Sequence, residues 1–428
     1  MIRFLYNLLF PLALLAFLPG YVVKMLRRGN YREKFGQRLG SYDRATRERL
    51  TGGRHTWMHA VSVGEVMIAL KLVATMKKTE PALRVVLTTT TTTGFALATR
   101  QAPDWLEVLY TPLDFWPIMR RAYALIRPVR IILVEAEVWP NMTTIAHQRK
   151  IPLALVNARL SARSEGRFRR FRSIVRPIFA RLDLVCVQEP EDIVRWESLG
   201  VKPARIHAVG SIKFDPMGDA PDPEKPRALL DEMGIDSARP ILLAGSTHDG
   251  EEEILAQVFQ RLREEFPDLF LIIAPRHVER AREIESGLRA LGLTTAYRST
   301  PTKNADVLLL DTTGELRNWY PVATIVFIGK SLSARGGQNP VEAIVADRPV
   351  LFGPHMENFA RLAEQLLKSG GALQPRDPAA LTSEAAALLR DPAARAALVR
   401  NARGVLEAHR GATARTAALL RNLRASAA

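Results

Sequence analysis

The stretch Thr324–Phe359, TIVFIGKSLSARGGQNPVEAIVADRPVLFGPHMENF, decides the fold of this chain. Its apolar run Thr324–Ile328 predicts a buried strand, and Pro349–Phe352 predicts a second one. Between the two strands, Gly336–Gly337 predicts a tight turn. A helix is expected to open at Asn339–Pro340, because a proline in the first helical turn loses no intrahelical hydrogen bond. A strand–loop–helix–strand unit of this kind is typical of a parallel α/β sheet.

The same stretch is a candidate ligand site. Gly336 and Gly337 allow the backbone to approach a ligand closely, and the N–H groups at the helix start favour an anion. Glu342 falls in the first helical turn, where its carboxylate is able to accept hydrogen bonds from sugar hydroxyls. An ordinary strand–loop–helix connection with Glu342 on the surface fits equally well, because the pattern is neither a Walker loop nor G-x-G-x-x-G.

Length and composition bound the class of protein. A chain of 428 residues is too long for one ordinary core and predicts two domains, and a hydrophobic content of 47% excludes a largely disordered chain. The single cysteine, Cys186, permits no internal disulfide, so a reducing compartment is expected. The net charge of +16 indicates an anionic partner. Three classes of partner fit this charge: a nucleic acid, an acidic lipid or a phosphorylated substrate.

The amino terminus predicts a membrane anchor over residues 1–28. Phe4–Val23 carries no formal charge and is about long enough to cross a bilayer. Pro11, Pro19 and Gly20 interrupt an ideal helix, so an anchor in the interface or a buried core helix stays open. A basic segment follows the apolar run, which disfavours a cleaved signal peptide and, by the positive-inside rule, keeps that side cytoplasmic.

The next part of the chain predicts a doubly wound half. Apolar strands precede polar or glycine-bearing turns at Thr56–Val61, Arg84–Leu87, Arg130–Val134, Pro152–Val156, Leu184–Val187 and Arg205–Val209. Helical stretches such as Val66–Met76 and Trp139–Gln148 intervene. Strands that alternate with helices imply a parallel sheet covered on both faces. Ligands of such sheets bind at the carboxyl ends of the strands.

Polar residues stand at several of these strand ends. Ser62 and Glu65 form the pattern S-x-x-E, which is that of a capping box and by itself needs no catalysis. Glu135 follows a buried strand, where a carboxylate is costly unless it is salt-bridged or used. Lys213 closes the first half and is either a cation for a negative leaving group or a surface lysine. Thr88–Thr93 is expected to line a helix entry without chemistry.

Between Arg159 and Arg181 lie eight arginines, three interleaved phenylalanines and a single acid. We call this segment the arginine belt. It would suit the phosphates of lipid headgroups or an anionic bilayer surface, and an ordinary solvated helix face is the alternative. No RNA- or DNA-binding signature accompanies it, so nucleic acid is not expected as a partner.

A proline-rich segment at residues 216–226 predicts a linker, and a second alternating half follows. Its strands Ile241–Ala244, Leu269–Ala274 and Val307–Leu310 precede the opening stretch. The alanine- and arginine-rich tail that ends at Ala428 predicts packing helices. Two such halves are expected to face a cleft, as in nucleotide-sugar glycosyltransferases.

Eight motifs, in order along nearly the whole chain, resemble the 3-deoxy-D-manno-octulosonic acid (Kdo) transferase family. They are HAVSVGE at 59–65, EAEVWPN at 135–141, NARLSARS at 157–164, GSIKFD at 210–215, GSTH at 245–248, PRH at 275–277, GEL at 314–316 and GGQNPVE at 336–342. The resemblance implies an α/β fold of GT-B type, with two Rossmann-like doubly wound domains and the amino-terminal anchor. The expected domains are 29–215 for the acceptor and 227–428 for the CMP-sugar.

The resemblance also implies the reaction. Members transfer Kdo from CMP-Kdo to a lipid A precursor (lipid IVA) in lipopolysaccharide biosynthesis, with inversion, at the cytoplasmic face of the inner membrane. By resemblance Glu65 is the general base, and Glu135 and Lys213 stabilise the transition state. The residues implied for CMP binding are Pro275, Arg276, Thr313, Gly314, Glu315, Asn339, Pro340, Val341 and Glu342.

This chemistry agrees with the residue types. Inversion needs one in-line displacement, in which a carboxylate takes the hydroxyl proton while cations and helix N-termini stabilise the departing phosphate. No DxD-like pair suggests a metal site, so the reaction is predicted to need neither a metal nor a cofactor. A glycosyltransferase with another donor or a nucleotide-sugar 2-epimerase of the same fold is the alternative. A non-catalytic binder would explain the charge but not the polar strand ends.

Overall fold

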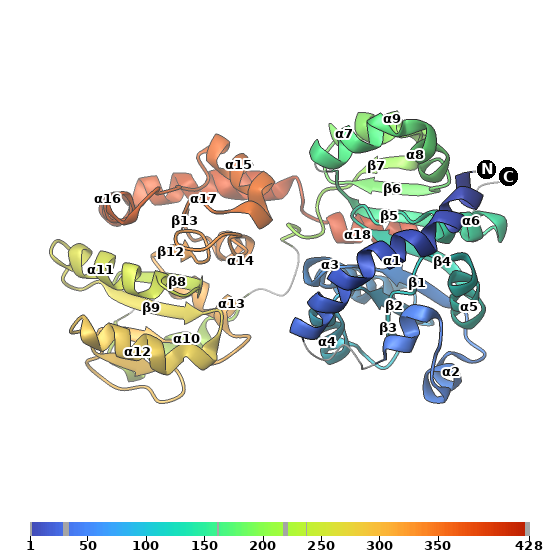
Figure 1. The fold of residues 1–428 in the computed structure, drawn as a ribbon. Helices are drawn as coiled ribbons and strands as arrows, with labels where there is room; N and C mark the ends of the chain where they lie inside the picture. Colours follow the sequence, from blue (N-terminus) through green and yellow to red (C-terminus); the bar gives the residue numbers. More distant parts are fainter. Residues whose placement is uncertain (1, 29–33, 161, 217–220, 237, 424–428) are drawn as a thin grey trace. The chain divides into compact units, whose positions relative to one another are not determined.

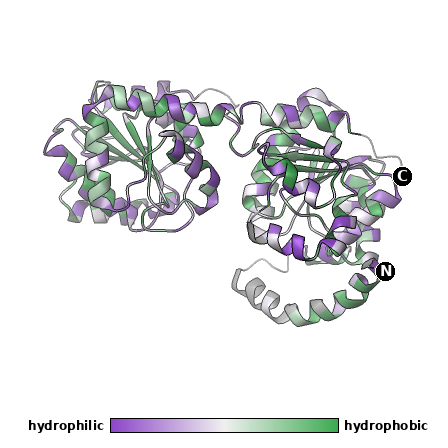
Figure 2. Cartoon of the chain, turned by 90° about the horizontal axis from the view of Figure 1, so that it is seen from above, coloured by the Kyte–Doolittle hydropathy of each residue, from purple (hydrophilic) through white to green (hydrophobic). Residues whose placement is uncertain are grey.

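The structure, a computed structural model, describes residues 2–28, 34–160, 162–216, 221–236 and 238–423. The chain forms two compact units: unit 1 is residues 1–215 together with 411–428, and unit 2 is residues 216–410. Each unit has a central parallel sheet flanked by helices (Figure 1). Apolar residues concentrate on the strands inside each unit (Figure 2). The predicted α/β class with parallel sheets is confirmed.

The sheet of unit 1 has the order β3-β2-β1-β4-β5-β6-β7, with every neighbouring pair parallel. Its strands are β1 (His55–His59), β2 (Val85–Thr89), β3 (Leu106–Tyr110), β4 (Pro128–Val134), β5 (Leu153–Ala158), β6 (Leu184–Val187) and β7 (Ile206–Ala208). The order reverses between β1 and β4, which is the switch point where doubly wound sheets bind ligands. The six predicted strands are present, and β3 was not predicted.

Helices cover both faces of this sheet because its strands are apolar on both sides. Trp57 and Ile131 point into one core, whereas their neighbours Met58 and Ile132 point into the other. The helices of unit 1 are α1 (Ile2–Arg28), α2 (Arg44–Leu50), α3 (Val63–Thr79), α4 (Thr92–Gln101), α5 (Trp116–Ile126), α6 (Pro140–Gln148), α7 (Ala162–Arg170), α8 (Arg172–Phe179), α9 (Asp192–Ser198) and α18 (Ala412–Arg421), with short 3-10 turns at Phe35–Leu39 and Pro203–Arg205.

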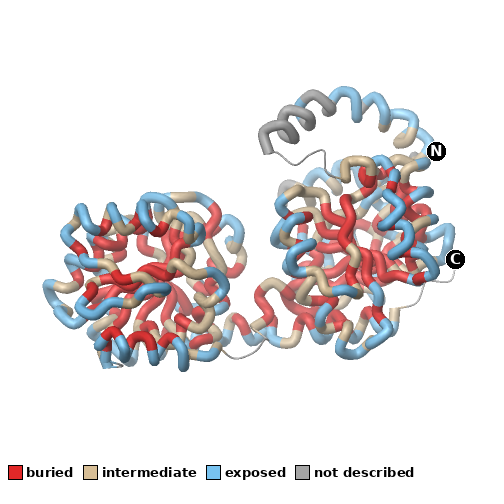
Figure 3. Tube along the Cα trace, turned by 90° about the horizontal axis from the view of Figure 1, so that it is seen from below, coloured by how far each residue is buried: buried red, intermediate tan, exposed pale blue. Residues whose placement is uncertain are grey.

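The amino-terminal segment is one helix, α1, which continues through the positions of Pro11 and Pro19. Its inner side packs on unit 1: the Phe10 ring stacks on Phe115 with centroids 5.4 Å apart, and Asn7 Nδ2 donates to Asn141 Oδ1 at 2.9 Å. Several residues of α1 are exposed (Figure 3). Within the described ranges, no helix combines the length and apolarity that crossing a membrane requires.

The sheet of unit 2 has the order β10-β11-β9-β8-β12-β13 and is also parallel. Its strands are β8 (Ile241–Thr247), β9 (Phe270–Pro275), β10 (Thr295–Tyr297), β11 (Val307–Leu309), β12 (Ile325–Ile328) and β13 (Val350–Phe352). Its helices are α10 (Glu224–Glu232), α11 (Glu251–Arg263), α12 (Ala281–Ala290), α13 (Leu316–Trp319), α14 (Val341–Val345), α15 (Ala360–Ser369), α16 (Pro378–Arg390) and α17 (Pro392–Glu407), with 3-10 turns at Val278–Arg280, Tyr320–Val322 and Glu357–Phe359. The strand–helix–strand prediction for residues 324–359 is therefore confirmed.

The last helix differs from the predicted domain division, which placed residues 227–428 together. Helix α18 packs against α3 of unit 1, and Leu420 lies in that core (Figure 1). Asp215 holds the segment in which the chain re-enters unit 1, because its carboxylate accepts hydrogen bonds from the N–H of Gly411 at 3.0 Å and of Thr413 at 2.8 Å. The chain therefore crosses from unit 1 to unit 2 and back.

The two glycines of the opening stretch have a structural role that the sequence analysis did not foresee. Both have a left-handed backbone, with φ of 126° at Gly336 and 69° at Gly337. A Cβ at Gly337 would lie 2.4 Å from the sulfur of Met356, and one at Gly336 would lie 2.7 Å from the amide of Asn358. The close approach that requires glycine here is to the chain itself, at residues 356–358.

Candidate active site

Glu65 lies at the start of α3, directly after the carboxyl end of β1. Ser62 and Glu65 form the predicted capping box: Glu65 N–H donates to Ser62 Oγ at 3.3 Å, and Ser62 N–H donates to Glu65 Oε1 at 3.3 Å. The other carboxylate oxygen accepts from Val61 N–H at 2.9 Å. Only 8% of Glu65 is exposed. The helix start thus holds this carboxylate in one orientation at the sheet edge.

Glu135 follows β4, the strand beside β1 in the sheet. Its φ of 62° is left-handed, a conformation that costs a residue other than glycine about 1–3 kcal/mol and is found mainly where a site requires it. Its N–H continues the ladder by donating to Val156 O at 3.0 Å. Burial, and next the negative charge of Glu65, raise the pKa of Glu135, while Arg159 and Lys213 oppose that rise.

Lys213 reaches the same edge from the loop after β7. The loop is held by Asn157, whose Oδ1 accepts a hydrogen bond from Ile212 N–H at 2.9 Å. Asn157 is the last residue but one of β5 and has a left-handed φ of 51°. Burial lowers the pKa of Lys213 to about 8, Glu135 opposes the shift and Arg159 adds to it. The ammonium group is therefore partly desolvated and strongly responsive to nearby negative charge.

Glu137 is a third carboxylate at this edge that the sequence analysis did not single out. Burial, then the charges of Glu65 and Glu135, raise the pKa of Glu137 to about 7, while a hydrogen bond from the Trp139 side chain opposes the rise. Its signal in the sequence was the alternation E-A-E directly after a buried strand. Arg159, which the sequence analysis counted in the arginine belt, also acts here through its charge on Glu135.

The structure thus brings together three acidic and two basic side chains at the switch point of unit 1. We call this group the unit 1 carboxylate site; it consists of Glu65, Glu135, Glu137, Arg159 and Lys213. Raised acid pKa values beside a lowered lysine pKa are typical of sites that move protons and stabilise charge. The arrangement is suited to a carboxylate base that acts beside a cation.

In unit 2 the corresponding edge is ordered by the buried carboxylate of Glu251. It accepts four backbone hydrogen bonds: Oε1 from Ser331 at 2.9 Å and Leu332 at 3.0 Å, and Oε2 from His248 at 2.9 Å and Lys330 at 2.6 Å. These contacts tie the loop after β12 to the end of β8. Glu251 is 0% exposed and is a positioning residue.

Cationic and imidazole side chains gather around that ordered loop. His248 and His277 lie edge to face with ring centroids 5.8 Å apart, and Gln338 Nε2 is 3.1 Å from His248 Nε2. Burial, and next the charge of Lys330, lower the pKa of His248, with Arg276 contributing to the same shift. We call this group the unit 2 basic edge; it consists of His248, Arg276, His277 and Lys330. It is suited to an anionic ligand.

Comparison with known proteins then decides the family. The profile described as "3-Deoxy-D-manno-octulosonic-acid transferase (kdotransferase)" matches residues 33–216. The 3-deoxy-D-manno-octulosonic acid transferase of Haemophilus influenzae is 33% identical over 395 residues, which are 91% of this chain and 91% of that protein. The protein of the same name from Bordetella pertussis is 36% identical over 372 residues, 84% and 85% of the two chains. This chain belongs to the Kdo transferase family.

Solved structures show the fold of this Kdo transferase family member. The UDP-GlcNAc 2-epimerase of Neisseria meningitidis, solved with UDP-GlcNAc, aligns with a TM-score of 0.57 over 86% of this chain and 100% of that one, at 11% identity. A putative UDP-N-acetylglucosamine 2-epimerase of Listeria monocytogenes aligns with a TM-score of 0.56 over 86% of this chain and 96% of that one, at 14% identity. At such identities the likeness shows an α/β fold of GT-B type.

The residues that Kdo transferase motifs predict for CMP binding all lie at the carboxyl edge of the unit 2 sheet. Pro275 ends β9, and Arg276 N–H donates to Thr247 O at 3.0 Å while its side chain is exposed. Glu342 lies in the first turn of α14; its side chain reaches solvent, yet the surrounding protein raises its pKa and Arg317 opposes that rise. Helix α14 begins at Val341, slightly later than predicted.

The remaining predicted CMP-binding positions are mostly loop backbone. Asn339 Oδ1 accepts from Val341 N–H at 3.1 Å, so this side chain closes a turn directly before α14. Thr313 and Gly314 are exposed after β11, and Gly314 has a left-handed φ of 86°. Glu315 pairs with Arg298 at 3.1 Å. Their roles toward CMP stay predictions.

The arginine belt forms α7 and α8 of the Kdo transferase unit 1. Two of its aromatic residues pack inward, with Phe168 and Phe179 centroids 5.4 Å apart, whereas Phe171 is exposed. The belt arginines whose residues are exposed are Arg159, Arg167, Arg169, Arg170, Arg172 and Arg176. The predicted threonines have structural contacts, since Thr88 Oγ1 accepts from the Trp57 indole at 3.0 Å and Thr91 caps α4.

Proposed function

We propose that this chain transfers Kdo from CMP-Kdo to a lipid A precursor, lipid IVA, with inversion, in lipopolysaccharide biosynthesis. The observation that carries the proposal is the family membership over nine-tenths of the chain, combined with the unit 1 carboxylate site at its motif positions. A fold of GT-B type by itself hosts several nucleotide-sugar reactions, so the site rather than the fold supports this one.

In the proposed reaction, the acceptor hydroxyl attacks the anomeric carbon of Kdo as the bond to the CMP phosphate breaks. Glu65 takes the hydroxyl proton, and its fixed orientation at the helix start keeps the accepting oxygen in place. Lys213 and Arg159 supply positive charge, and Glu135 stabilises the positive charge that develops on the sugar. No cofactor enters these steps.

CMP-Kdo carries two anionic groups, a phosphate and the sugar carboxylate. The unit 2 basic edge offers Arg276, Lys330 and two imidazoles for these groups. The exposed carboxylate of Glu342 is suited to accept hydrogen bonds from ribose hydroxyls. Glu251 holds the loop in the shape that presents these side chains.

The proposed site of action is the cytoplasmic face of the inner membrane. The outer side of α1 exposes a run of large apolar residues, which are Phe4, Leu5, Leu8, Leu9, Leu12 and Leu15. A helix with such a face lies in a bilayer interface with its apolar side chains inserted. The exposed arginines of the belt add attraction to anionic lipid.

The proposal is tested by incubating the full chain with CMP-Kdo and the tetra-acylated lipid A precursor and measuring products by mass spectrometry. The expected result is CMP release together with a precursor heavier by one or more Kdo residues. A parallel incubation with UDP-GlcNAc tests the epimerase alternative. Epimerised UDP-sugar without any Kdo product would overturn the proposed function.

A further inference from the structure

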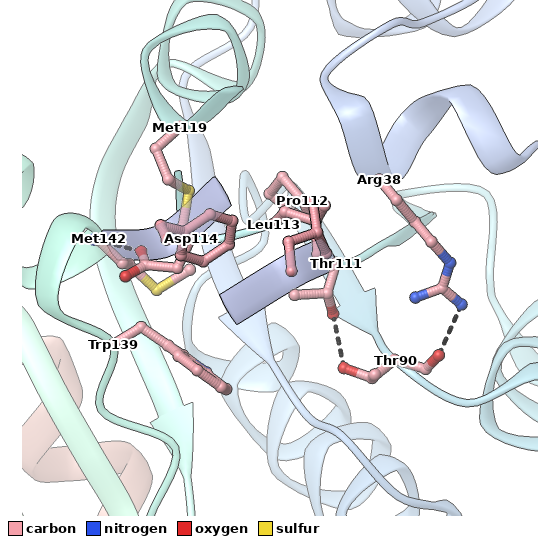
Figure 4. Close-up of a pocket in the computed structure, with 11 residues that line it drawn as sticks. Arg38, Thr90, Thr111, Pro112, Leu113, Asp114, Met119, Trp139 and Met142 are labelled. Atoms are coloured by element: carbon pink, nitrogen blue, oxygen red, sulfur yellow. Dashed lines mark hydrogen bonds between the residues drawn. The ribbon is translucent and has the colours of Figure 1, made fainter. Parts of the chain in front are cut away.

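A pocket of about 410 Å³ lies in unit 1 under α1. It is lined by Phe10 and Leu14 of α1 and by residues that follow β2, β3 and β4. Figure 4 shows Met119, Met142 and Trp139 on one side and Leu113 with Thr111 on the other. A pocket of this size and composition is suited to a hydrocarbon group.

The polar groups in the wall are already bonded to the protein. Arg38 donates to Thr90 O at 2.7 Å, and Thr90 Oγ1 is 3.2 Å from Thr111 Oγ1 (Figure 4). The Asp114 carboxylate accepts from the N–H groups of Asn141 and Met142, both at 2.9 Å. The surface left for a ligand is therefore mostly carbon and sulfur, which disfavours a sugar or a nucleotide as occupant.

Trp139 connects this pocket to the proposed chemistry. Its ring lines the pocket, and its side chain hydrogen-bonds to Glu137 of the unit 1 carboxylate site. A ligand that places an apolar chain in the pocket would thus bring its polar end to the carboxylates. Leu14, which also lines the pocket, is 37% exposed and belongs to the same helix as the outward leucines. The apolar lining is therefore continuous with the apolar face of α1.

We propose that this pocket holds one acyl chain of the acceptor, so that the sugar of the acceptor lies at Glu137 and the unit 1 carboxylate site. This inference rests on the proposed function, and it explains how the protein selects an acylated acceptor over a sugar without acyl chains. The acyl chain contributes binding energy remote from the reacting hydroxyl, which positions that hydroxyl for proton transfer.

The test uses two variants of a single wall residue. The side chain of Leu113 is half-buried, and its backbone N–H donates to Arg38 O at 2.9 Å, a bond that substitution leaves in place. Leu113→Trp fills the pocket, and Leu113→Asp puts a charge into it. The matched controls are Val194→Trp and Val194→Asp on α9, where Val194 is 68% exposed. Unfolding midpoints establish that all four variants are folded.

Kdo transfer is then measured with the tetra-acylated precursor and with the same disaccharide after removal of its acyl chains. Both Leu113 variants should raise KM for the acylated acceptor about tenfold or more, which corresponds to losing roughly two buried methylene groups. They should leave KM for the deacylated acceptor and for CMP-Kdo unchanged, as should the controls for all substrates. Equal effects on both acceptors, or none on the acylated one, would overturn the inference.

A binding measurement separates this inference from the proposed function. Dodecyl phosphate brominated in mid-chain, used below its critical micelle concentration, should quench part of the tryptophan fluorescence of the unmodified protein, and Trp139→Phe should remove that part. Leu113→Asp should abolish the quenching, whereas Val194→Asp should retain it. Quenching that survives in Leu113→Asp overturns the acyl pocket. Failure of the unmodified protein to transfer Kdo to either acceptor would refute the proposed function instead, while quenching still reports on the pocket.

Discussion

Glu65 and Glu135 follow neighbouring strands of the unit 1 sheet, and the negative charge of Glu65 raises the pKa of Glu135. The positive charges of Arg159 and Lys213 oppose this rise in the pKa of Glu135. Glu137 adds a third acid to the same group. Glu137 and Lys213 therefore change their protonation states near neutral pH.

Glu137 should make folding stability depend on pH. Its pKa is about 7 in the folded protein against an ordinary value of 4.5, so between these pH values the folded state binds more protons than the unfolded state. Stability from this group is therefore complete below about pH 4.5 and is lost as the pH rises through about 7. Glutamine does not ionise, so Glu137→Gln should remove this loss of folding stability. The loss is on the order of 2 kcal/mol after allowance for solvent screening.

The measurement is urea unfolding of both proteins at pH 5 and pH 8. The matched control is Glu191→Gln, because Glu191 is exposed on the surface of unit 1. Glu137→Gln should be stabilised relative to the unmodified protein at pH 8 more than at pH 5, and Glu191→Gln should show no such difference. An identical pH dependence in all three proteins would mean that the pKa of Glu137 is not raised in the folded state.

Lys213 should set the alkaline limit of activity. Burial lowers the pKa of Lys213 to about 8, so its positive charge is lost as the pH rises through that value. The rate of Kdo transfer should then fall on the alkaline side, since the cation that stabilises the transition state is gone. Lys213→Arg keeps its charge at high pH and should lose the alkaline fall, with a lower rate throughout because guanidinium geometry differs. A pH–rate profile with the same alkaline fall in both proteins would exclude this role.

The sequence predicted the strands of both sheets from their apolar runs, together with the polar residues at their ends. It missed β3 and β10, which lie at the edges of the two sheets, and β10 has only the three residues Thr295–Tyr297. It also assigned α18 to the second domain. Where that helix packs depends on contacts between distant segments, such as α18 with α3 and Asp215 with Thr413.

The predicted site residues lie at the sheet edges, because parallel strands bring their carboxyl ends together. What the sequence could not reveal depends on contacts between distant segments. Glu137 is perturbed by Glu65, Glu251 orders a loop that begins near Lys330, and Phe10 of α1 stacks on Phe115. No local pattern distinguishes such residues from ordinary surface acids or core aromatics.

The nucleotide site should depend on Glu342 and Arg276 in different ways. Glu342→Ala should weaken CMP binding by about 1–3 kcal/mol, the usual cost of losing a hydrogen bond to a charged group. Arg276→Ala should weaken it too, and its effect should shrink more at high salt, because an exposed charge is screened. Calorimetry with CMP at two salt concentrations measures both effects, and Glu364→Ala on the exposed side of α15 is the control. Unchanged affinity in both variants would remove these residues from the nucleotide site.

Membrane binding should be shared between α1 and the arginine belt. Deletion of residues 1–23 should release the protein from anionic vesicles only in part at low salt, and high salt should release the rest because belt attraction is screened. The double variant Leu8→Glu with Leu12→Glu should show the same partial release as the deletion, because both leucines are exposed and the inner face of α1 is kept. The control places glutamates at the exposed Leu39 and Val194. Sedimentation with vesicles measures binding; complete release at low salt would show that the belt is only a solvated face.

The central claim is that Glu65 is a base as well as a cap, and two substitutions separate these roles. Glu65→Gln keeps a capping residue but cannot take a proton. Since both oxygens of Glu65 accept N–H bonds here, from Val61 and Ser62, the amide should also cost about 1 kcal/mol of stability. Ser62→Ala weakens the cap by about 1 kcal/mol and leaves the carboxylate in place. The two variants thus match in stability and differ in the base.

The most direct measurement is the initial rate of Kdo transfer from CMP-Kdo to the lipid A precursor by these two variants and the unmodified protein. We expect Glu65→Gln to be slower by about 100-fold or more, the effect of losing a general base, with CMP affinity unchanged. Ser62→Ala should stay within a few-fold of the unmodified rate. Transfer by Glu65→Gln at close to the unmodified rate, or an equal loss in Ser62→Ala, would contradict the account and leave Glu65 as a helix cap.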